Sequence, residues 1–149
     1  DRVDVRDKAL FITGRISCEM ALKAYRAGCP VLVSRKSATD EAVRRAEELG
    51  ADALSIITPS FALASQKELY DHYVAVAKQV NIPIILYNIP PRTGNKLLPE
   101  TVQALCRDVD VIVGAKDSSG DIENLKAYIR LTRELDKDVA ILAGNDARS

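Results

Sequence analysis

Short apolar runs alternate along this chain with longer segments in which apolar residues recur at the spacing of a helix. Six runs have the length and apolar character of buried strands, at 10–13, 31–33, 53–57, 82–86, 111–113 and 139–143. Segments of helical period separate them, at 17–27, 37–49, 65–80, 99–107 and 122–135. Because strand and helix alternate, the pattern predicts an α/β fold of about six mostly parallel strands.

Several helical segments carry sequence signals for their ends and faces. Ser65 and Glu68 have the spacing of a capping box, which predicts a helix that begins at this serine. Pro99 suits the first turn of the next helix, because a proline there costs no hydrogen bond. In the last segment we expect a buried apolar stripe formed by Ile122, Leu125, Ile129 and Thr132 or Leu135.

The predicted strands are continuous apolar runs, so the sheet must be covered on both faces or curl around a filled interior. Two architectures satisfy this pattern. One is an open three-layer α/β/α sheet, and the other is a partial (β/α) barrel that winds steadily in one direction. Both place functional groups at the carboxyl ends of the strands. A partial barrel exposes two sheet edges, which predicts a homodimer that covers them, whereas a closed three-layer sheet could remain a monomer.

Length and charge limit the classes of partner. The chain has 149 residues, enough for a single domain with a core of its own. Its 21 basic and 21 acidic residues are interleaved, which argues against nucleic acid or an anionic membrane as a partner. No apolar stretch approaches the roughly 20 residues of a membrane span, and no charged-then-apolar leader opens the chain. We therefore expect a soluble, cytoplasmic protein.

The cysteine and histidine residues indicate no metal site. Cys18, Cys29 and Cys106 are far apart and form no Cys-x-x-Cys pair, so neither a disulfide framework nor a zinc site is predicted. His72 lies beside Asp71 on a polar face, where we expect a solvated side chain rather than a ligand. No carboxylates have the spacing of metal ligands and no phosphate-binding loop is present, so we expect neither a metal nor a cofactor.

Tyr87 and Lys116 are the main candidates for catalytic residues. Each closes a predicted strand, the tyrosine in Tyr-Asn-Ile-Pro-Pro-Arg-Thr-Gly at 87–94 and the lysine in Gly-Ala-Lys-Asp-Ser-Ser-Gly at 114–120. A lysine removed from water gives up its proton more readily and can attack a carbonyl carbon as a free amine. A tyrosine at the end of the neighbouring strand can shuttle the protons that such a reaction moves.

The stretch from about 50 to 146 resembles the dihydrodipicolinate synthase and N-acetylneuraminate lyase family of pyruvate-dependent class I aldolases. The resemblance rests on the two motifs just described and on further blocks in the order and spacing of the family. These blocks are Gly-Ala-Asp-Ala-Leu at 50–54, Thr-Pro-Ser-Phe at 58–61, Ser-Gln-Lys-Glu-Leu-Tyr at 65–70 and Pro-Glu-Thr at 99–101. In that family they lie on the fourth to seventh strands of an eight-stranded barrel.

This resemblance implies a role for each of five residues. Lys116 would form a Schiff base with a keto acid such as pyruvate, and Tyr87 would relay protons. Arg92, Thr93 and Gly94 would belong to the loop that meets the aldehyde substrate. No cofactor is implied, because the lysine itself supplies the reactive group.

The chain departs from the family pattern at two places. Ser60 and Phe61 stand where Tyr-Tyr is commoner, so a side-chain hydroxyl role there is not carried over. The Gly-Thr-Thr-Gly-Glu segment that grips the pyruvate carboxylate is absent, and the pair Thr13 and Gly14 is followed by Arg15. Losing that grip removes positioning that can lower a barrier by roughly 7–11 kcal/mol in a well-oriented site.

Residues 1 to about 49 resemble a different family. The stretches at 9–24, 28–35 and 38–39 are similar to the carboxyl-terminal part of the formate dehydrogenase accessory sulfurtransferases, which have a cytidine-deaminase-like three-layer fold. The two resemblances meet in Ala-Glu-Glu-Leu-Gly at 46–50. We therefore expect one α/β domain over 1–149 with a junction between two fragments near 46–51.

Three functional hypotheses follow. The leading one is an engineered or recombined fold chimera that serves as a structural scaffold without efficient catalysis, in which Lys116 and Tyr87 are relics. The alternative is a residual pyruvate-dependent Schiff-base lyase. A third is a binding module that holds an anion at the helix terminus after Arg15.

Overall fold

The computed structural model describes residues 9–12, 26, 31–34, 48, 51–60 and 62–144. Several predictions lie outside these residues, namely those for Cys18, for Cys29, for the turn at 13–15 and for most of the expected junction at 46–51. The candidate catalytic residues all lie within the described part.

The described residues form six strands, each of which overlaps a predicted apolar run. All pairings are parallel, and they build a two-stranded sheet of β1 and β2 and a four-stranded sheet in the order β3-β4-β5-β6. The prediction of parallel strands in an α/β fold is therefore confirmed. The strands are β1 (Ala9–Ile12), β2 (Val31–Ser34), β3 (Leu54–Ile57), β4 (Ile84–Asn88), β5 (Ile112–Asp117) and β6 (Ala140–Ala143).

Helices connect the strands of the larger sheet. They are α3 (Gln66–Ala77), α4 (Pro90–Thr93), α5 (Pro99–Asp108) and α6 (Ile122–Thr132). The capping box before α3 is confirmed, because the N–H of Glu68 donates to Ser65 Oγ and the N–H of Ser65 donates to Glu68 Oε2. Pro99 lies in the first turn of α5, as predicted.

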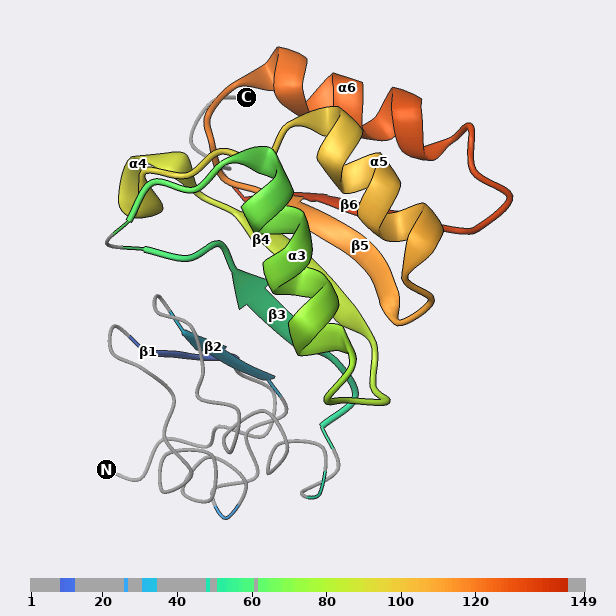
Figure 1. Ribbon diagram of the computed structural model, residues 1–149. Coiled ribbons are helices and arrows are strands. Elements are labelled where there is room, and N and C mark those ends of the chain that lie inside the picture. The colour runs from blue at the N-terminus through green and yellow to red at the C-terminus, as the bar shows by residue number, and fades with distance from the viewer. Residues whose placement is uncertain are drawn as a thin grey trace.

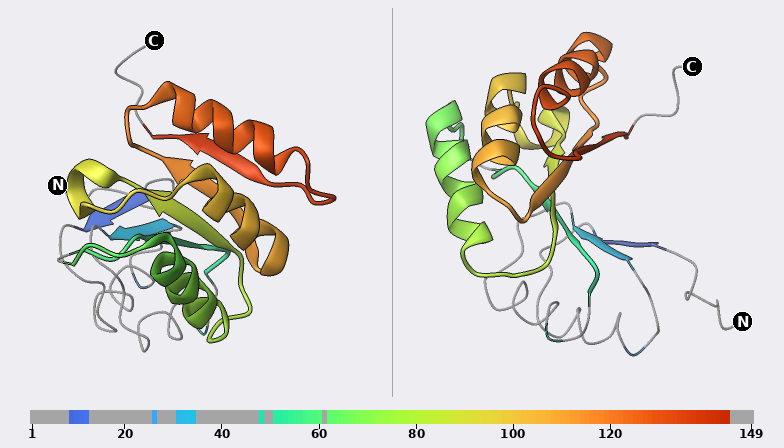
Figure 2. Two further views of the ribbon diagram at one scale, coloured as in Figure 1. Left: turned by 45° about the horizontal axis from the view of Figure 1, so that its top comes forward. Right: turned by 90° about the vertical axis from the view of Figure 1, so that its right-hand side faces the viewer.

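The order of the strands and the side on which the helices lie favour the partial barrel over the open three-layer sheet. The described strands follow one another in sequence order with no reversal, whereas a doubly wound sheet changes direction at a switch point. Helices α3, α5 and α6 lie in one layer on the same face of the four-stranded sheet (Figures 1 and 2). Strand β2 contacts β3 at the other end of the series. Steady winding with helices outside is the pattern of a (β/α) barrel.

The core lies between the four-stranded sheet and its helices. Two fully buried tyrosines span it, and each satisfies its hydroxyl on a backbone oxygen: Tyr73 donates to Ile56 and Tyr128 donates to Leu97. Cys106 is also fully buried, and burial raises the pKa of its thiol to about 11, so it is an inert structural thiol. The apolar side chains of the core include Ile56, Leu69, Ile84, Leu86, Leu97, Val102, Leu105, Ile112 and Ala115.

The predicted apolar stripe of α6 is wrong at its amino-terminal end. Ile122 is 61 % exposed, whereas Asn124 and Tyr128 are buried. Asn124 tolerates burial because its amide donates to the carboxylate of Asp117. The helix is therefore rotated toward a polar contact that helical periodicity alone does not reveal.

His72 also differs from the expectation of a solvated side chain. Its Nε2 atom is buried without a hydrogen-bond partner, and its ring packs edge-on against Tyr73 with centroids 5.2 Å apart. Desolvation lowers the pKa of this imidazole.

Of the helices that the structure describes, none combines the length and the apolar character that crossing a membrane requires.

Candidate active site

Tyr87 and Lys116 are direct neighbours at the carboxyl ends of β4 and β5. They are register partners in the parallel ladder. Leu86 and Ala115, one residue earlier, belong to the core beneath the helices. Because side chains alternate along a strand, Tyr87 and Lys116 project from the opposite face, which in a (β/α) barrel is the interior.

The lysine amine lies over the face of the tyrosine ring. Lys116 Nζ is 4.4 Å from the ring centroid of Tyr87. Tyr87 is buried and Lys116 is half-buried, so the amine is partly screened from water. A cation at such a distance from an aromatic face is attracted by about 0.5–1 kcal/mol. The arrangement therefore places an amine nitrogen over an aromatic ring that carries a hydroxyl group.

Ser118 is a site residue that the sequence reasoning missed. It is buried, and its Oγ has no hydrogen-bond partner. The position of a Cβ built on Gly144 lies 1.9 Å from this Oγ and 2.9 Å from Cε of Lys116, so the hydroxyl and the lysine side chain approach the same point. Its signal in the sequence is its place two residues after the lysine, which on an extended strand points to the same face.

Gly144 closes the site from the side of β6. This residue comes immediately after Ala143, the last residue of β6. Its N–H donates to the backbone oxygen of Asp117 over 2.7 Å. A side chain at this position would overlap Ser118 and Lys116. A glycine is therefore needed for the end of β6 to come this close to the lysine.

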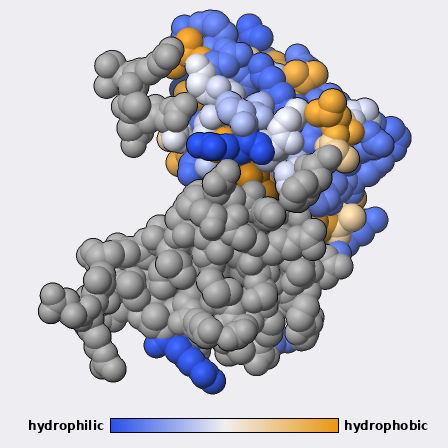
Figure 3. All heavy atoms as spheres, turned by 90° about the vertical axis from the view of Figure 1, so that its left-hand side faces the viewer, coloured by the Kyte–Doolittle hydropathy of each residue, from blue (hydrophilic) through white to orange (hydrophobic). Residues whose placement is uncertain are grey.

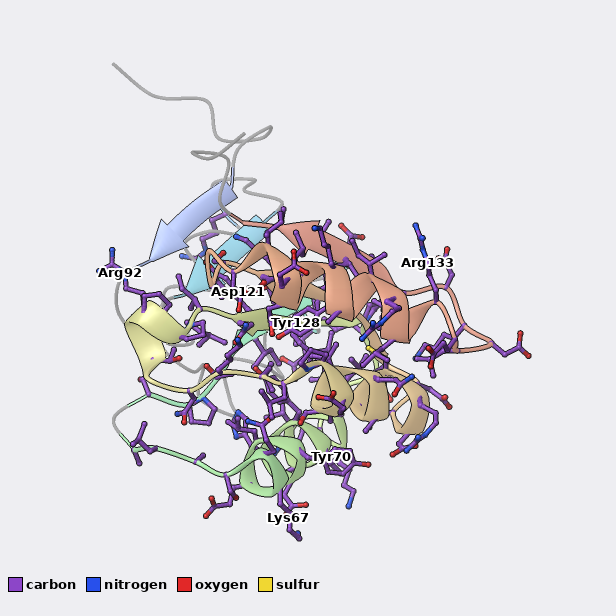
Figure 4. All side chains as sticks on the ribbon, turned by 90° about the horizontal axis from the view of Figure 1, so that it is seen from above. Lys67, Tyr70, Arg92, Asp121, Tyr128 and Arg133 are labelled. Carbon is purple, nitrogen blue, oxygen red and sulfur yellow. The ribbon has the colours of Figure 1, made fainter. Side chains whose placement is uncertain are left out.

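The predicted substrate loop lies in and directly after α4, which follows the carboxyl end of β4. Thr93 is buried, and its hydroxyl accepts from Thr58 Oγ1 over 2.9 Å and donates to the backbone oxygen of Asn95 over 3.1 Å. Arg92 is exposed at the margin of the molecule (Figure 4), and Gly94 ends the helix with a φ of 77°. Their contact with an aldehyde stays a prediction, and the Thr93 hydroxyl already has protein partners.

Asn95, which the sequence reasoning also missed, ties the loop after β3 to the loop after α4. Its amide nitrogen donates to the backbone oxygens of Pro59 and Ala62, both over 2.8 Å, and its oxygen accepts from the N–H of Ala64. The residue is almost fully buried. This clamp holds the 58–64 loop against α4, at the carboxyl ends of β3 and β4 (Figure 1).

Among the residues that the structure describes, no group of three or more histidine, cysteine, aspartate or glutamate side chains is placed to hold a metal ion.

Comparison with known proteins gives one consistent result. The sequence profile of the dihydrodipicolinate synthetase family matches residues 17–149. The 4-hydroxy-tetrahydrodipicolinate synthase of Thermotoga neapolitana is 38 % identical over 107 residues, which cover 72 % of this chain and 36 % of the relative. That of Syntrophus aciditrophicus is 41 % identical over 132 residues, covering 86 % of this chain and 44 % of the relative. This chain thus spans well under half of these two relatives.

Solved structures agree. A monomeric dihydrodipicolinate synthase variant superposes with a TM-score of 0.80 at 29 % identity, covering 95 % of this chain and 53 % of that one. Dihydrodipicolinate synthase from Thermotoga maritima superposes with a TM-score of 0.76 at 30 % identity, and the match covers 88 % of this chain and 47 % of that one. A prophage protein of the same family from E. coli, solved in complex with pyruvate, superposes with a TM-score of 0.78 at 26 % identity, and the match covers 93 % of this chain and 52 % of that one.

The range of residues matched by the family can be compared with the expected junction between two fragments. The family match begins at residue 17 and so runs through the expected junction near 46–51 and over most of the stretch that resembles a sulfurtransferase. The sulfurtransferase part and the chimera are therefore not supported by the comparisons, whereas the aldolase resemblance is confirmed. The chain belongs to the dihydrodipicolinate synthetase family.

Proposed function

We propose that this chain carries the Schiff-base chemistry of a pyruvate-dependent lyase or synthase, with Lys116 as the nucleophile and Tyr87 as the proton relay. The observation that supports it most is the position of Lys116 Nζ, 4.4 Å from the centre of the Tyr87 ring on the register-paired strand. The choice of keto acid is supported by a similar structure that was solved in complex with pyruvate.

In the proposed reaction the amine nitrogen of Lys116 adds to the keto carbon of pyruvate, and the keto oxygen takes up a proton. That hydroxyl leaves as water with a second proton, and an imine remains. Loss of a methyl proton then gives an enamine, which can attack an aldehyde carbon. Tyr87 gives and accepts the protons, Ser118 Oγ donates a hydrogen bond to a substrate oxygen, and Arg92, Thr93 and Gly94 lie on the side of the aldehyde.

We expect the rate to be limited by how the substrate is positioned. The Gly-Thr-Thr-Gly-Glu segment that grips the pyruvate carboxylate in the family does not occur in this sequence. Imine formation needs only the amine and its proton relay, whereas a complete turnover also needs the groups that hold both substrates. We therefore propose slow imine formation by this chain.

Reductive trapping tests this proposal. The protein is incubated with pyruvate and borohydride, and the modified peptide is identified by mass spectrometry. One reduced pyruvate on Lys116 is the expected result, with none on the exposed Lys67, which serves as an internal control. A Lys116→Arg variant should take up no label. Equal labelling of both lysines, or no labelling, would contradict the proposal.

The second candidate is a scaffold without efficient catalysis. It is supported by the missing carboxylate grip, because a substrate that is not held in position reacts slowly. In this reading Lys116 and Tyr87 keep the geometry of a relative while the substrate is no longer held. It predicts that trapping at Lys116 is no faster than at an exposed lysine.

A second copy of this chain is the proposed protein partner. Strand β6 ends the four-stranded sheet, and its residues Ala140, Leu142 and Ala143 are exposed. On the face in Figure 3, hydrophobic residues form only small separate groups over the described part. Among the described strands, β6 has one neighbour in the sheet, and an unpaired strand edge can pair with a strand of another chain. Sedimentation of the protein with Leu142→Lys, which places a charge on that edge strand, tests this: the proposed dimer should become a monomer.

A further inference from the structure

Asn88 and Asp117 face each other directly behind the catalytic pair. They follow Tyr87 and Lys116 in the chain and are the next register partners of β4 and β5. Their side chains lie on the helix side of the sheet, where Asn88 is 0 % and Asp117 5 % exposed. Asn88 Nδ2 donates to Asp117 Oδ1 over 2.8 Å. Two successive positions of the ladder thus carry a candidate reactive pair on one face of the sheet and a buried polar pair on the other.

Both buried side chains are fully engaged. Asn88 Oδ1 accepts from the N–H of Leu97 over 3.0 Å. The carboxylate of Asp117 also accepts from Ser119, through Oγ at 2.9 Å and N–H at 3.2 Å, and from Asn124 Nδ2 at 3.3 Å. In the part of the chain that the structure describes, no basic side chain pairs with this carboxylate. Neutral donors alone hold it.

The ladder between β4 and β5 contains a bulge, so a further contact is needed to fix the pairing of the two strands. Ile84 pairs with Ile112, but the next residue, Ile85, pairs with Gly114, so one residue of β5 is skipped. The pairing of β4 with β5 before the bulge therefore does not determine which residues pair after it. A slip of one residue would turn Lys116 to the helix side of the sheet.

We propose that Asn88 and Asp117 are positioning residues whose hydrogen bond fixes the register beyond the bulge and thereby holds Lys116 over the ring of Tyr87. A buried polar pair adds less stability than apolar side chains of the same shape, and fixing a register is the best-attested reason to keep one. The backbone agrees, because the N–H of Ser118 donates to the Asn88 oxygen over 2.8 Å just past the pair. The expected effect on catalysis rests on the proposed function. The effect on the position of Lys116 over the Tyr87 ring does not.

Two isosteric substitutions separate the hydrogen bond from the buried charge. Asn88→Asp keeps an acceptor for Leu97 but removes the donor to Asp117. Asp117→Asn removes the charge but keeps an oxygen that accepts from Asn88. Thr132→Val is the matched control, because it removes a buried hydrogen bond to the backbone oxygen of Tyr128 and so weakens the same core without removing a partner of Asn88 or Asp117.

The readout is the NMR shift of the Lys116 ε-methylene protons in protein with 13C-labelled lysine. The Tyr87 ring beneath them displaces this signal by its ring current, Lys116→Arg assigns it, and Tyr87→Leu gives its value without the ring. We expect Asn88→Asp to lose more than half of the displacement at neutral pH. Asp117→Asn and Thr132→Val should keep most of it, although Thr132→Val is less stable.

Two outcomes would overturn the proposal: a folded Asn88→Asp variant with the native displacement, or a folded Asp117→Asn variant that loses as much as Asn88→Asp. If Asn88→Asp does not fold, Asn88→Leu decides, because it removes the donor to Asp117 without adding a second carboxylate. A folded Asn88→Leu variant with the native displacement would equally contradict the proposal.

Trapping with pyruvate on the same variants keeps this inference separate from the proposed function. Asn88→Asp should slow labelling of Lys116 by on the order of 100-fold, the effect of a misplacement of about 1 Å. If the wild-type protein is not labelled but the NMR pattern holds, the proposed function fails and the positioning role stands. If labelling occurs and the NMR pattern is absent, the positioning role fails alone.

Discussion

The backbone N–H of Gly144 donates to the backbone oxygen of Asp117, and this contact brings the end of β6 against the side chain of Lys116. A methyl group added at Gly144 would lie 1.9 Å from Ser118 Oγ and 2.9 Å from Cε of Lys116. We therefore expect Gly144→Ala to displace the lysine and to slow its labelling by pyruvate, with a stability loss of about 1–3 kcal/mol from overpacking. Ala143→Ser, an exposed change on the same strand, is the control. Native labelling by the alanine variant would show that the lysine does not depend on this approach.

The phenol of Tyr87 can be tested apart from its ring. Tyr87→Phe keeps the aromatic face beneath the amine but removes the group that exchanges protons. We expect imine trapping at Lys116 to slow by roughly 100-fold or more, the usual contribution of general acid–base catalysis, at little cost in stability. Tyr73→Phe removes a tyrosine hydroxyl on the helix side and should lower stability without slowing the trapping. Equal rates for the two variants would argue against a proton relay.

Lys137 should stabilise the fold through backbone oxygens. Its Nζ lies 2.8 to 3.2 Å from four of them, those of Cys106, Val109, Asp110 and Ile112, where α5 ends and β5 begins. We expect Lys137→Met to lower the free energy of unfolding by about 1–3 kcal/mol, because these partly buried oxygens lose a charged donor. Lys126→Met, which removes only an exposed ion pair to Glu123, should change it by less than about 0.5 kcal/mol. Urea denaturation of both variants measures the difference.

The Asn95 clamp should control how the 58–64 loop is held. Asn95→Ala removes three hydrogen bonds and leaves buried backbone groups without partners, so we expect a loss of at least about 2 kcal/mol. Limited proteolysis should then cut within 58–64 faster than in the wild-type protein. Gln79→Ala, just beyond the end of α3, removes one exposed hydrogen bond to the backbone oxygen of Ala75. It is the control and should leave the cleavage pattern unchanged. Protection of the loop in Asn95→Ala would show that other contacts hold it.

His72 should make the protein less stable as the pH falls. Burial lowers the pKa of its imidazole in the folded state, so the unfolded chain, with an imidazole pKa near 6.5, binds a proton first. The stability that this neutral side chain contributes is present above about pH 6.5 and is lost as the pH drops through that value. His72→Phe keeps the edge-on contact with Tyr73 and should flatten this part of the stability profile, by at most about 1.4 kcal/mol per pH unit. Identical pH slopes for the two proteins would contradict the prediction.

Local patterns predicted the elements and the central pair. The apolar runs located the strands, the capping box at Ser65 located the start of α3, and adjacent strand ends were enough to bring Tyr87 and Lys116 together. Each of these signals is contained within a few residues or depends only on strands that follow one another in sequence. Patterns of this kind are visible in the chain itself.

The polar residues that hold the site together could not be predicted in this way. Asn95, Asp117 and Asn124 are buried because their partners come from other elements, and hydropathy alone places such residues on the surface. The same limit explains the rotated face of α6 and the buried imidazole of His72. Ser118 could have been found by alternation from Lys116, but its missing partner is a property of the packed site.

The sequential strand order has a consequence for how the site forms. Tyr87 and Lys116 both belong to the single strand–helix–strand unit from β4 to β5, and the bulge and the Asn88–Asp117 hydrogen bond lie within the same unit. Contacts between units adjacent in sequence form early and at small cost in chain entropy. The geometry of Tyr87 and Lys116 thus depends mainly on one local unit, so we expect it to persist when other parts of the barrel differ.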